Sequence, residues 1–303
     1  MQSEATLNDF FWVLRMGSAS QMTEHLRNSY TESERITMLN KDELMFDAGA
    51  TRITTGRTPL MTACSGVDSQ MVKVLLDFKA DPNFQRKQCR KRKRCRHRNT
   101  TAPYDALSTA VAFGRLEIVR TLLYNKCHIN AGPHLGCTSL FMACEIDNTN
   151  IVRVLLQSSA DPNCTLWSNA MTPLMACRSN SVCSLLLESK ASVNATDSNG
   201  QTALMHCSAR DNSKAVARIL LDSTCNMCVR DNAGETALSL AEKVGKDSGK
   251  PSTSAEILRN EAIVKTKFIR QKAQNAIIRD IFPAHPCLRY IGKEITRMLT
   301  YGK

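Results

Sequence analysis

The chain has 303 residues, of which 43% are hydrophobic, 5% aromatic and 22% charged, so disorder of the whole chain is excluded. Its formal net charge is +12, but residues 86–98 alone contain nine Lys or Arg and no acid. The positive charge is therefore local, which disfavours a uniformly basic nucleic-acid-binding domain.

The cysteines and the start of the chain favour an intracellular protein. Thirteen cysteines form no regular framework, and an odd number cannot be fully paired within one chain. Residues 1–4 are not a basic stretch that leads into an apolar signal core. No apolar run approaches the roughly 18 to 20 residues that span a bilayer. We expect a reduced protein of the cytoplasm, the nucleus or both, without a membrane partner.

The amino-terminal segment, residues 1–50, is predicted to form a divergent capping helix pair followed by a linker. Apolar residues at helical spacing lie on both sides of Gly17: Phe10, Phe11, Val13 and Leu14 before it, and Met22 and Leu26 after it. The linker, residues 30–56, is longer than a turn requires, and an extra helix is predicted around residues 33–39. This segment would cap the amino-terminal end of a repeat array.

Residues 51–263 contain a repeated pattern that predicts pairs of short helices. The copies begin at Thr58, Asp105, Thr138, Thr172, Thr202 and Thr236, with spacings of 47, 33, 34, 30 and 34 residues. A second stretch, Val-x-x-(Leu/Ile)-Leu, begins at Val72, Val119, Val152, Val182 and Val216. Its apolar residues at i, i+3 and i+4 share one face of a helix, so each copy is predicted to bury one amphipathic helix.

The repeat resembles the ankyrin family, whose period is about 33 residues and whose copies begin Thr-Pro-Leu-His-x-Ala. Residues 58–60 and 172–174 match that start, and residues 197–202 and 231–236 match the β-turn finger. The resemblance implies an all-α solenoid of about six to seven stacked helix-turn-helix repeats with β-turn fingers, plus a carboxy-terminal helical extension. It also implies a non-catalytic scaffold or adaptor that binds one or more proteins. We expect it to be a monomer.

Three features depart from the family pattern. The family's histidine is replaced by Met61, Phe141, Met175 and Met205, so packing is predicted to substitute for its polar link. Small positions of the first helices hold Cys64, Cys144 and Cys177, which are predicted to be buried structural thiols. The copy at Thr172 reaches its valine in 10 residues where other copies take 14, which removes about one helical turn.

A basic insertion lengthens one finger. The junction from Val72 to Asp105 takes 33 residues where the others take 19 to 20, and the surplus matches residues 86–98. Its cations are Arg86, Lys87, Arg90, Lys91, Arg92, Lys93, Arg94, Arg96 and Arg98. Residues 90–94 resemble a nuclear-import signal for an importin. The alternatives are binding of RNA or another polyanion by charge, a solvated loop without a partner, or a metal at Cys89, Cys95 and His97.

Candidate protein-binding residues come from the finger tips and the exposed side of the first helices, as the resemblance implies. Trp167 is the most informative, because tryptophan is favoured at interface hot spots. The alternative is that it packs on the next finger. Other finger-tip candidates are His134, Leu135, Asn199 and Asn232. The residues predicted to face the groove from the first helices are Thr62, Thr109, Met142 and His206.

No motif of an enzyme occurs in the sequence. A phosphate-binding glycine loop, an H-E-x-x-H pair and a paired C-x-x-C are all absent from it, so we expect neither catalysis nor a cofactor.

The last segment, residues 264–303, is predicted to be an amphipathic helical extension. Residues 264–282 form its first helix, and Pro283 and Pro286 separate it from a final helix over residues 288–299. This segment caps the end of the array. As an alternative, residues 268–270 and 277–279 resemble parts of a suppressor-of-cytokine-signalling-type box, although its Leu-Cys-Arg core is absent. That resemblance implies a substrate-recognition subunit of a ubiquitin ligase.

Overall fold

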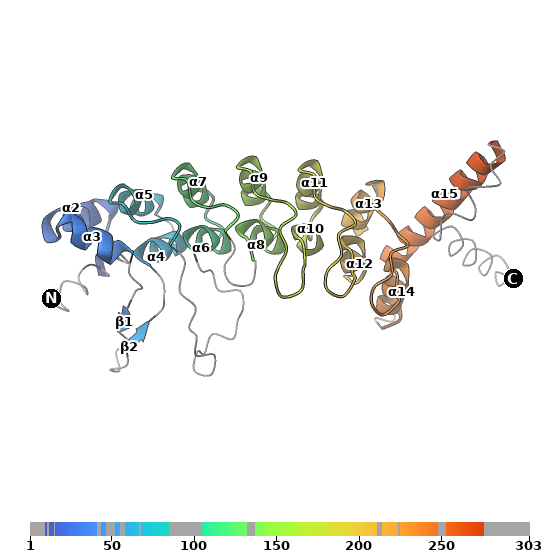
Figure 1. The fold of residues 1–303 in the computed structure, drawn as a ribbon, viewed down its shortest axis with the longest axis horizontal. Coiled ribbons are helices and arrows are strands. Elements are labelled where there is room, and N and C mark those ends of the chain that lie inside the picture. The colour runs from blue at the N-terminus through green and yellow to red at the C-terminus, as the bar shows by residue number, and fades with distance from the viewer. Residues whose placement is uncertain are drawn as a thin grey trace. The chain divides into compact units, whose positions relative to one another are not determined.

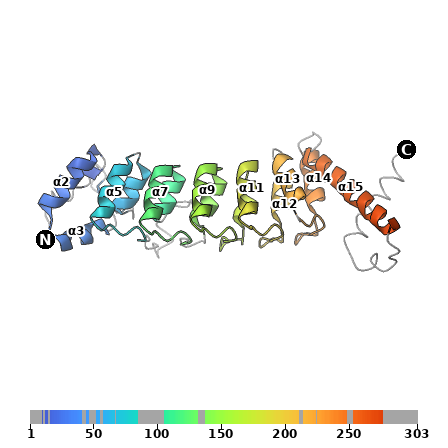
Figure 2. The ribbon, with the colours of Figure 1, turned by 90° about the horizontal axis from the view of Figure 1, so that it is seen from above.

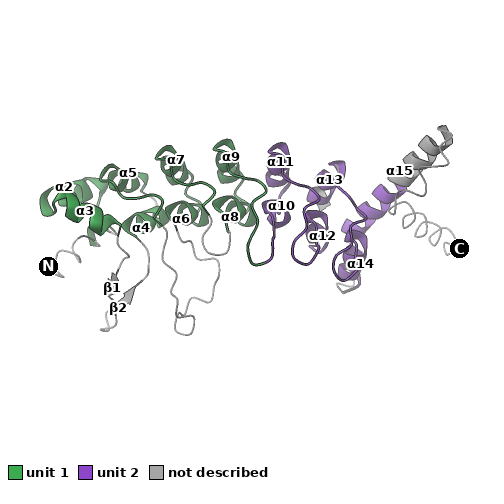
Figure 3. Ribbon diagram, viewed as in Figure 1, with its two compact units in different colours: residues 1–168 green, residues 169–303 purple. Residues whose placement is uncertain are grey.

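A computed structural model describes most of the chain. The residues it describes are 10, 12–14, 16–40, 44–46, 52–54, 58–66, 68–84, 105–131, 137–210, 214–223, 225–247 and 253–275. The predictions for the basic segment 86–98, for His134 and Leu135, and for residues 276–303 lie outside these ranges. The chain divides into two compact units, residues 1–168 and residues 169–303 (Figure 3).

Unit 1 consists of two rows of short helices (Figure 1). Its helices are α2 (Ala19–Ser29), α3 (Glu32–Leu39), α4 (Pro59–Ser65), α5 (Ser69–Asp77), α6 (Ala106–Ala112), α7 (Leu116–Tyr124), α8 (Ser139–Glu145) and α9 (Thr149–Gln157). The first helices α4, α6 and α8 pack in sequence, and the second helices α5, α7 and α9 form a parallel row. Helix α2 packs on α5 at the amino-terminal end, as a cap would.

Unit 2 repeats the same arrangement (Figure 2). Its helices are α10 (Pro173–Ala176), α11 (Asn180–Glu188), α12 (Ala203–Ser208), α13 (Lys214–Asp222), α14 (Ala237–Asp247) and α15 (Thr253–Asn275). Helices α10, α12 and α14 pack in one row, and α11, α13 and α15 pack in the other. The predicted helix pairs and their order along the chain are therefore present in both units.

Polar caps fix where the first helices begin. The hydroxyl oxygen of Thr58 accepts a hydrogen bond from the backbone N of Met61 at 3.2 Å, and Thr138 and Thr202 cap α8 and α12 in the same way. In α12 the Met205 sulfur in turn accepts a hydrogen bond from the backbone N of Thr202 at 3.5 Å. Methionine thus contributes a local polar contact at the position where the family pattern has histidine.

The core lies between the two rows of helices in each unit. The predicted stripe of the second helices is fully buried at Val119 and Leu122, and the equivalent residues of α5 and α9 are buried as well. Each such leucine contributes roughly 1.5 to 3 kcal/mol through burial. The residues that replace the family's histidine, among them Met61 and Phe141, are also in the interior, as predicted.

Several local features differ from the sequence prediction or refine it. An antiparallel hairpin of β1 (Leu44–Phe46) and β2 (Arg52–Thr54) adds two short strands to the predicted all-α fold. The predicted extra helix is present as α3. Helix α10 has four residues, which confirms the predicted loss of a turn. Helix α15 runs through residue 263 without a break, so the predicted boundary there falls inside a helix.

Candidate functional site

The two fingers of unit 2 are turns closed by an aspartate and a glycine. Asp197 Oδ1 accepts hydrogen bonds from the backbone N of Asn199 at 2.9 Å and of Gln201 at 2.8 Å. Asp231 makes the equivalent bonds in the next finger, to Ala233 and Glu235. The glycines that close the two turns, Gly200 and Gly234, have φ values of 76° and 80°. The sequence therefore builds the same finger twice.

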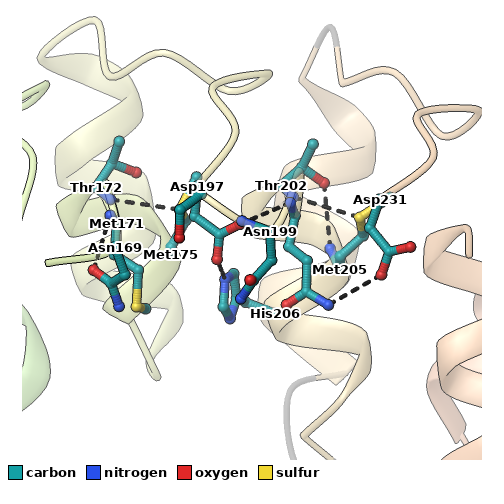
Figure 4. Close-up of polar contacts among 12 residues, drawn as sticks. Asn169, Met171, Thr172, Met175, Asp197, Asn199, Thr202, Met205, His206 and Asp231 are labelled. Carbon is teal, nitrogen blue, oxygen red and sulfur yellow. Dashed lines mark hydrogen bonds and ion pairs between the residues drawn. The ribbon is translucent and has the colours of Figure 1, made fainter. Parts of the chain in front are cut away.

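Neighbouring repeats of unit 2 are bonded to each other through these fingers (Figure 4). The backbone N of Ser198 donates to the Asn169 carbonyl at 2.9 Å, and the backbone N of Asn232 donates to the Asn199 carbonyl at 2.9 Å. The Asn232 side chain adds a bond from its Nδ2 to the Ser198 carbonyl at 3.0 Å. The fingers of unit 2 therefore form a hydrogen-bonded ladder.

His206 joins α12 to the finger that precedes it. Its Nε2 lies 2.9 Å from Asp197 Oδ2, and 17% of the His206 side chain and 2% of the Asp197 side chain are exposed. Asp197 thus accepts three hydrogen bonds, two from its own finger and one from the following first helix. His206 does reach the groove side, as predicted, but its Nε2 is engaged within the protein.

Unit 1 links its repeats at a different place, where the chain leaves each second helix. Asn40 Oδ1 accepts a hydrogen bond from the backbone N of Asp81 at 2.8 Å. Asn83 Oδ1 accepts one from His128 at 2.6 Å, and Asn130 Oδ1 accepts one from Asp161 at 2.9 Å. One asparagine per junction therefore ties each described repeat of unit 1 to the next.

The predicted groove residues do not share one environment. Thr62 is half-buried. Thr109 and Met142 are buried, and Thr109 Oγ1 donates to the Asp105 carbonyl at 2.7 Å. The prediction that these two side chains face the groove is therefore wrong, because they lie one helical position too far inward.

The predicted finger-tip residues are exposed where the structure describes them. Asn199 and Asn232 are both exposed, although the Asn232 amide is engaged by the neighbouring finger. Trp167 is 72% exposed, in the segment between α9 and α10. That segment lacks the aspartate and the glycine of the unit 2 fingers. Of the predicted contact residues, Trp167 thus offers the largest exposed apolar surface.

Sequence reasoning missed two exposed apolar residues in unit 1. Phe113 directly follows α6 and is 45% exposed, and Ile146 directly follows α8 and is 44% exposed. They are 33 residues apart, which is one repeat period. An apolar residue after the last turn of two successive first helices, where the chain leaves the core, was the signal that could have identified them.

The predicted structural thiols are in the interior. Cys64, Cys144 and Cys177 are all buried. Burial raises the pKa of Cys64 far above the usual range of a thiol, and the nearby Asp105 acts in the same direction. Burial likewise raises the pKa of Cys127 to about 12. These thiols are held in the protonated form, which is unreactive toward electrophiles and metals.

Comparison with known proteins matches residues 36–250 to the family described as ankyrin repeats (3 copies), in overlapping stretches. The transient receptor potential channel pyrexia of Drosophila melanogaster is 35% identical over 108 residues. That alignment covers 36% of this chain and 10% of the channel, so the chain spans about a tenth of this relative's length. Among the described residues, no helix is both long and apolar enough to cross a bilayer.

Proposed function

The chain belongs to the ankyrin-repeat family, and from this premise we propose that it is a scaffold or adaptor that holds partner proteins against its finger tips and first helices. Repeats of this family are protein-interaction modules. The specific partners depend on side chains at exposed positions, because the repeat motif itself encodes the stack. We infer that binding, and not chemistry, is what the exposed surface has to explain.

The exposure of Trp167 carries this proposal. A tryptophan with 72% of its surface exposed loses no packing in the free protein and gains a large apolar area on binding. It lies between α9 and α10, in the segment that corresponds to a finger. Tryptophan is among the residues most enriched at interface hot spots, where truncation costs about 2 kcal/mol or more.

The test is affinity purification of the full chain from cells, comparing wild type with Trp167→Ala. We expect Trp167→Ala to lose at least one partner that the wild type retains, with a drop of about 30-fold or more in affinity for that partner. The matched control is Tyr124→Ala, which removes an 88% exposed aromatic side chain from α7, away from the fingers. If both variants retain all partners at unchanged affinity, the role proposed for the fingers is wrong.

The sequence of residues 86–98 supports a second candidate function, nuclear import through an importin or binding of RNA or another polyanion. Deleting residues 86–98 distinguishes these alternatives from an inert loop. Import predicts that the deleted protein leaves the nucleus while its other partners are unchanged. Polyanion binding predicts RNA affinity that falls steeply with added salt and disappears with the deletion. If location, partners and RNA binding are all unchanged, the segment has neither function.

A further inference from the structure

The turns that join first to second helices form a separate surface on unit 1, which we call the turn edge. It comprises residues 65–70 between α4 and α5, residues 113–117 between α6 and α7, and residues 145–150 between α8 and α9. Phe113 and Ile146 lie on this edge at equivalent positions, each directly after its first helix. Both are nearly half exposed, whereas Gly66 occupies the same position after α4.

The spacing of the two apolar side chains follows from the packing of their helices. Helices α6 and α8 pack side by side, and packed helices lie about 8 to 10 Å apart. Phe113 and Ile146 therefore present two apolar anchors roughly 10 Å apart. An extended peptide covers that distance in about three residues, and a helix covers it in about two turns. A single short segment of a partner can thus contact both.

The charges on the turn edge are mostly negative. Its acids are Asp68, Glu117, Glu145 and Asp147, and Arg115 is its one cation. Arg115 is half-buried, and its Nε has no hydrogen-bond partner among the described residues. The edge therefore attracts cations to the immediate surroundings of the two apolar anchors.

Some of these acids have a structural reason to be there, and one does not. Asp68 Oδ1 caps α5 by accepting from the backbone N of Gln70 at 2.8 Å, and Glu117 lies in the favourable first turn of α7. Glu145 is the last residue of α8, where the helix dipole disfavours a negative charge. It is exposed and makes no ion pair within the described ranges. Helix stability therefore does not explain this acid, which lies next to Ile146.

We infer that the turn edge of unit 1 docks a segment of another protein that presents two apolar side chains about 10 Å apart, flanked by Lys or Arg. This inference rests on the proposed function, and it names the partner chemistry at a second surface that is distinct from the Trp167 finger. Nucleic acid is a poor occupant because its phosphates would face four acids. A second copy of the chain is also a poor occupant, because a two-fold contact would bring the same acids together.

The test is a display library of random twelve-residue peptides, selected on the full chain. The peptides recovered are measured on three variants, Phe113→Ser/Ile146→Ser, Glu145→Lys and Ile36→Ser. Ile36 is the matched control, since it is exposed on α3 in the same unit but away from the turn edge. Thermal unfolding of each variant is recorded alongside, and all four sites are on the surface, so all three variants should fold.

The expected peptides contain two apolar residues and at least two Lys or Arg. Their affinity should fall tenfold or more on Phe113→Ser/Ile146→Ser, fall severalfold on Glu145→Lys, and remain unchanged on Ile36→Ser. Reselection on Glu145→Lys should yield fewer basic peptides. Peptides that are acidic, or whose binding is unaffected by the Phe113 and Ile146 substitutions, would overturn the inference.

The two proposals fail in different ways. If peptides are recovered whose binding depends on Trp167 but not on Phe113 and Ile146, the proposed function stands and the inference about the turn edge is wrong. If peptides depend on Phe113, Ile146 and Glu145 but not on Trp167, the turn edge binds and the role of the finger is wrong. If no peptide is recovered on any form of the chain, both proposals fail.

Discussion

Units 1 and 2 bond their repeats to each other at different places. In unit 1 the bonds are at the exits of the second helices, where Asn40, Asn83 and Asn130 each accept a hydrogen bond from the next repeat. Unit 2 has such a bond from Asn226 to Asn194 at 2.7 Å, and it also has bonds between successive fingers. The fingers of unit 2 are thus part of the framework that holds its repeats.

This difference indicates where binding residues should be sought. In unit 2 the polar groups nearest the finger tips are already engaged by neighbours, as the Asn232 amide is. In unit 1 the exposed side chains Phe113, Ile146 and Trp167 are apolar and largely accessible. A side chain that already holds the fold cannot be optimised for a partner without loss of stability. We therefore expect the strongest contacts to come from unit 1.

The largest loss of stability is expected when a unit 2 finger loses its aspartate. Asp197→Ala leaves two backbone N–H groups and His206 without their acceptor, and Asp197 is buried. The expected loss is about 3 kcal/mol in the free energy of unfolding, measured by urea denaturation. Asp231→Ala is the matched control, and it should lose less than half as much because Asp231 is only half-buried. Equal losses would contradict a special role for the Asp197 finger.

A second pair of variants isolates the contact between fingers. Gly200 and Gly234 both have positive φ, so alanine at either position costs roughly 1 to 2 kcal/mol through backbone strain. A Cβ at Gly200 would also lie 2.9 Å from Asn232 Oδ1, whereas a Cβ at Gly234 meets nothing within 4 Å. Gly200→Ala should therefore destabilise more than Gly234→Ala in the same denaturation experiment. If the two variants are equally stable, the fingers are not in contact in solution.

A smaller effect is expected from the asparagine links of unit 1. Asn130→Ala removes the acceptor of the Asp161 backbone N–H and should cost about 1 kcal/mol, because the bond is exposed. Asn130→Asp keeps an oxygen at the same place and should lose less. Hydrogen exchange at Asp161 provides the local measurement, with faster exchange expected in Asn130→Ala. Unchanged exchange in that variant would show that the link contributes nothing.

The smallest effect concerns the start of α6, where unit 1 has an aspartate and the other repeats have threonine. Burial raises the pKa of Asp105, and hydrogen bonds from Ser108 oppose this shift. The ionised form is thus disfavoured in the folded state, so this group lowers stability as the pH rises from about 3.8 through the raised pKa. Asp105→Thr keeps a capping oxygen and should stabilise by on the order of 1 kcal/mol at pH 7.

The pH dependence provides the control for this prediction. Thermal unfolding of Asp105→Thr and wild type should differ most at pH 7 and become similar near pH 3.5, where the carboxyl is protonated in both states. A stabilisation that is the same at both pH values would show that the threonine acts through packing and not through removal of a buried charge. A variant that is less stable than wild type at pH 7 would contradict the prediction.

Much of the fold could be predicted because the repeat encodes it locally. The residue that begins each first helix and the Val-x-x-(Leu/Ile)-Leu stretch recur at nearly constant spacing, so the helices and their buried face follow from helical periodicity. The hairpin β1–β2 could not be predicted in this way, because it lies in a linker with no counterpart in the other repeats. The continuous helix α15 was missed because the array was assumed to end where its repeat pattern ends.

The candidate site was less predictable, because exposure depends on the rotation of each helix in the stack. Trp167 was identified from its residue type and its place in a finger. Thr109 and Met142 were chosen by motif position, yet the neighbouring helices bury them, and the exposed residues lie three to four positions further on, at Phe113 and Ile146. A period identifies equivalent residues, but it does not reveal which of them remain accessible once the helices have packed.

Helix α15 has a mechanical consequence. It packs on α13 and α14, with Ala255 and Leu258 buried, and its backbone continues unbroken to Asn275. Twenty-three helical residues make a rod about 34 Å long. Because one end of this rod is clamped in the last repeat, a load applied at the other end acts on that repeat as torque. The last repeat is therefore the part of unit 2 that any tension on the far end of α15 would strain first.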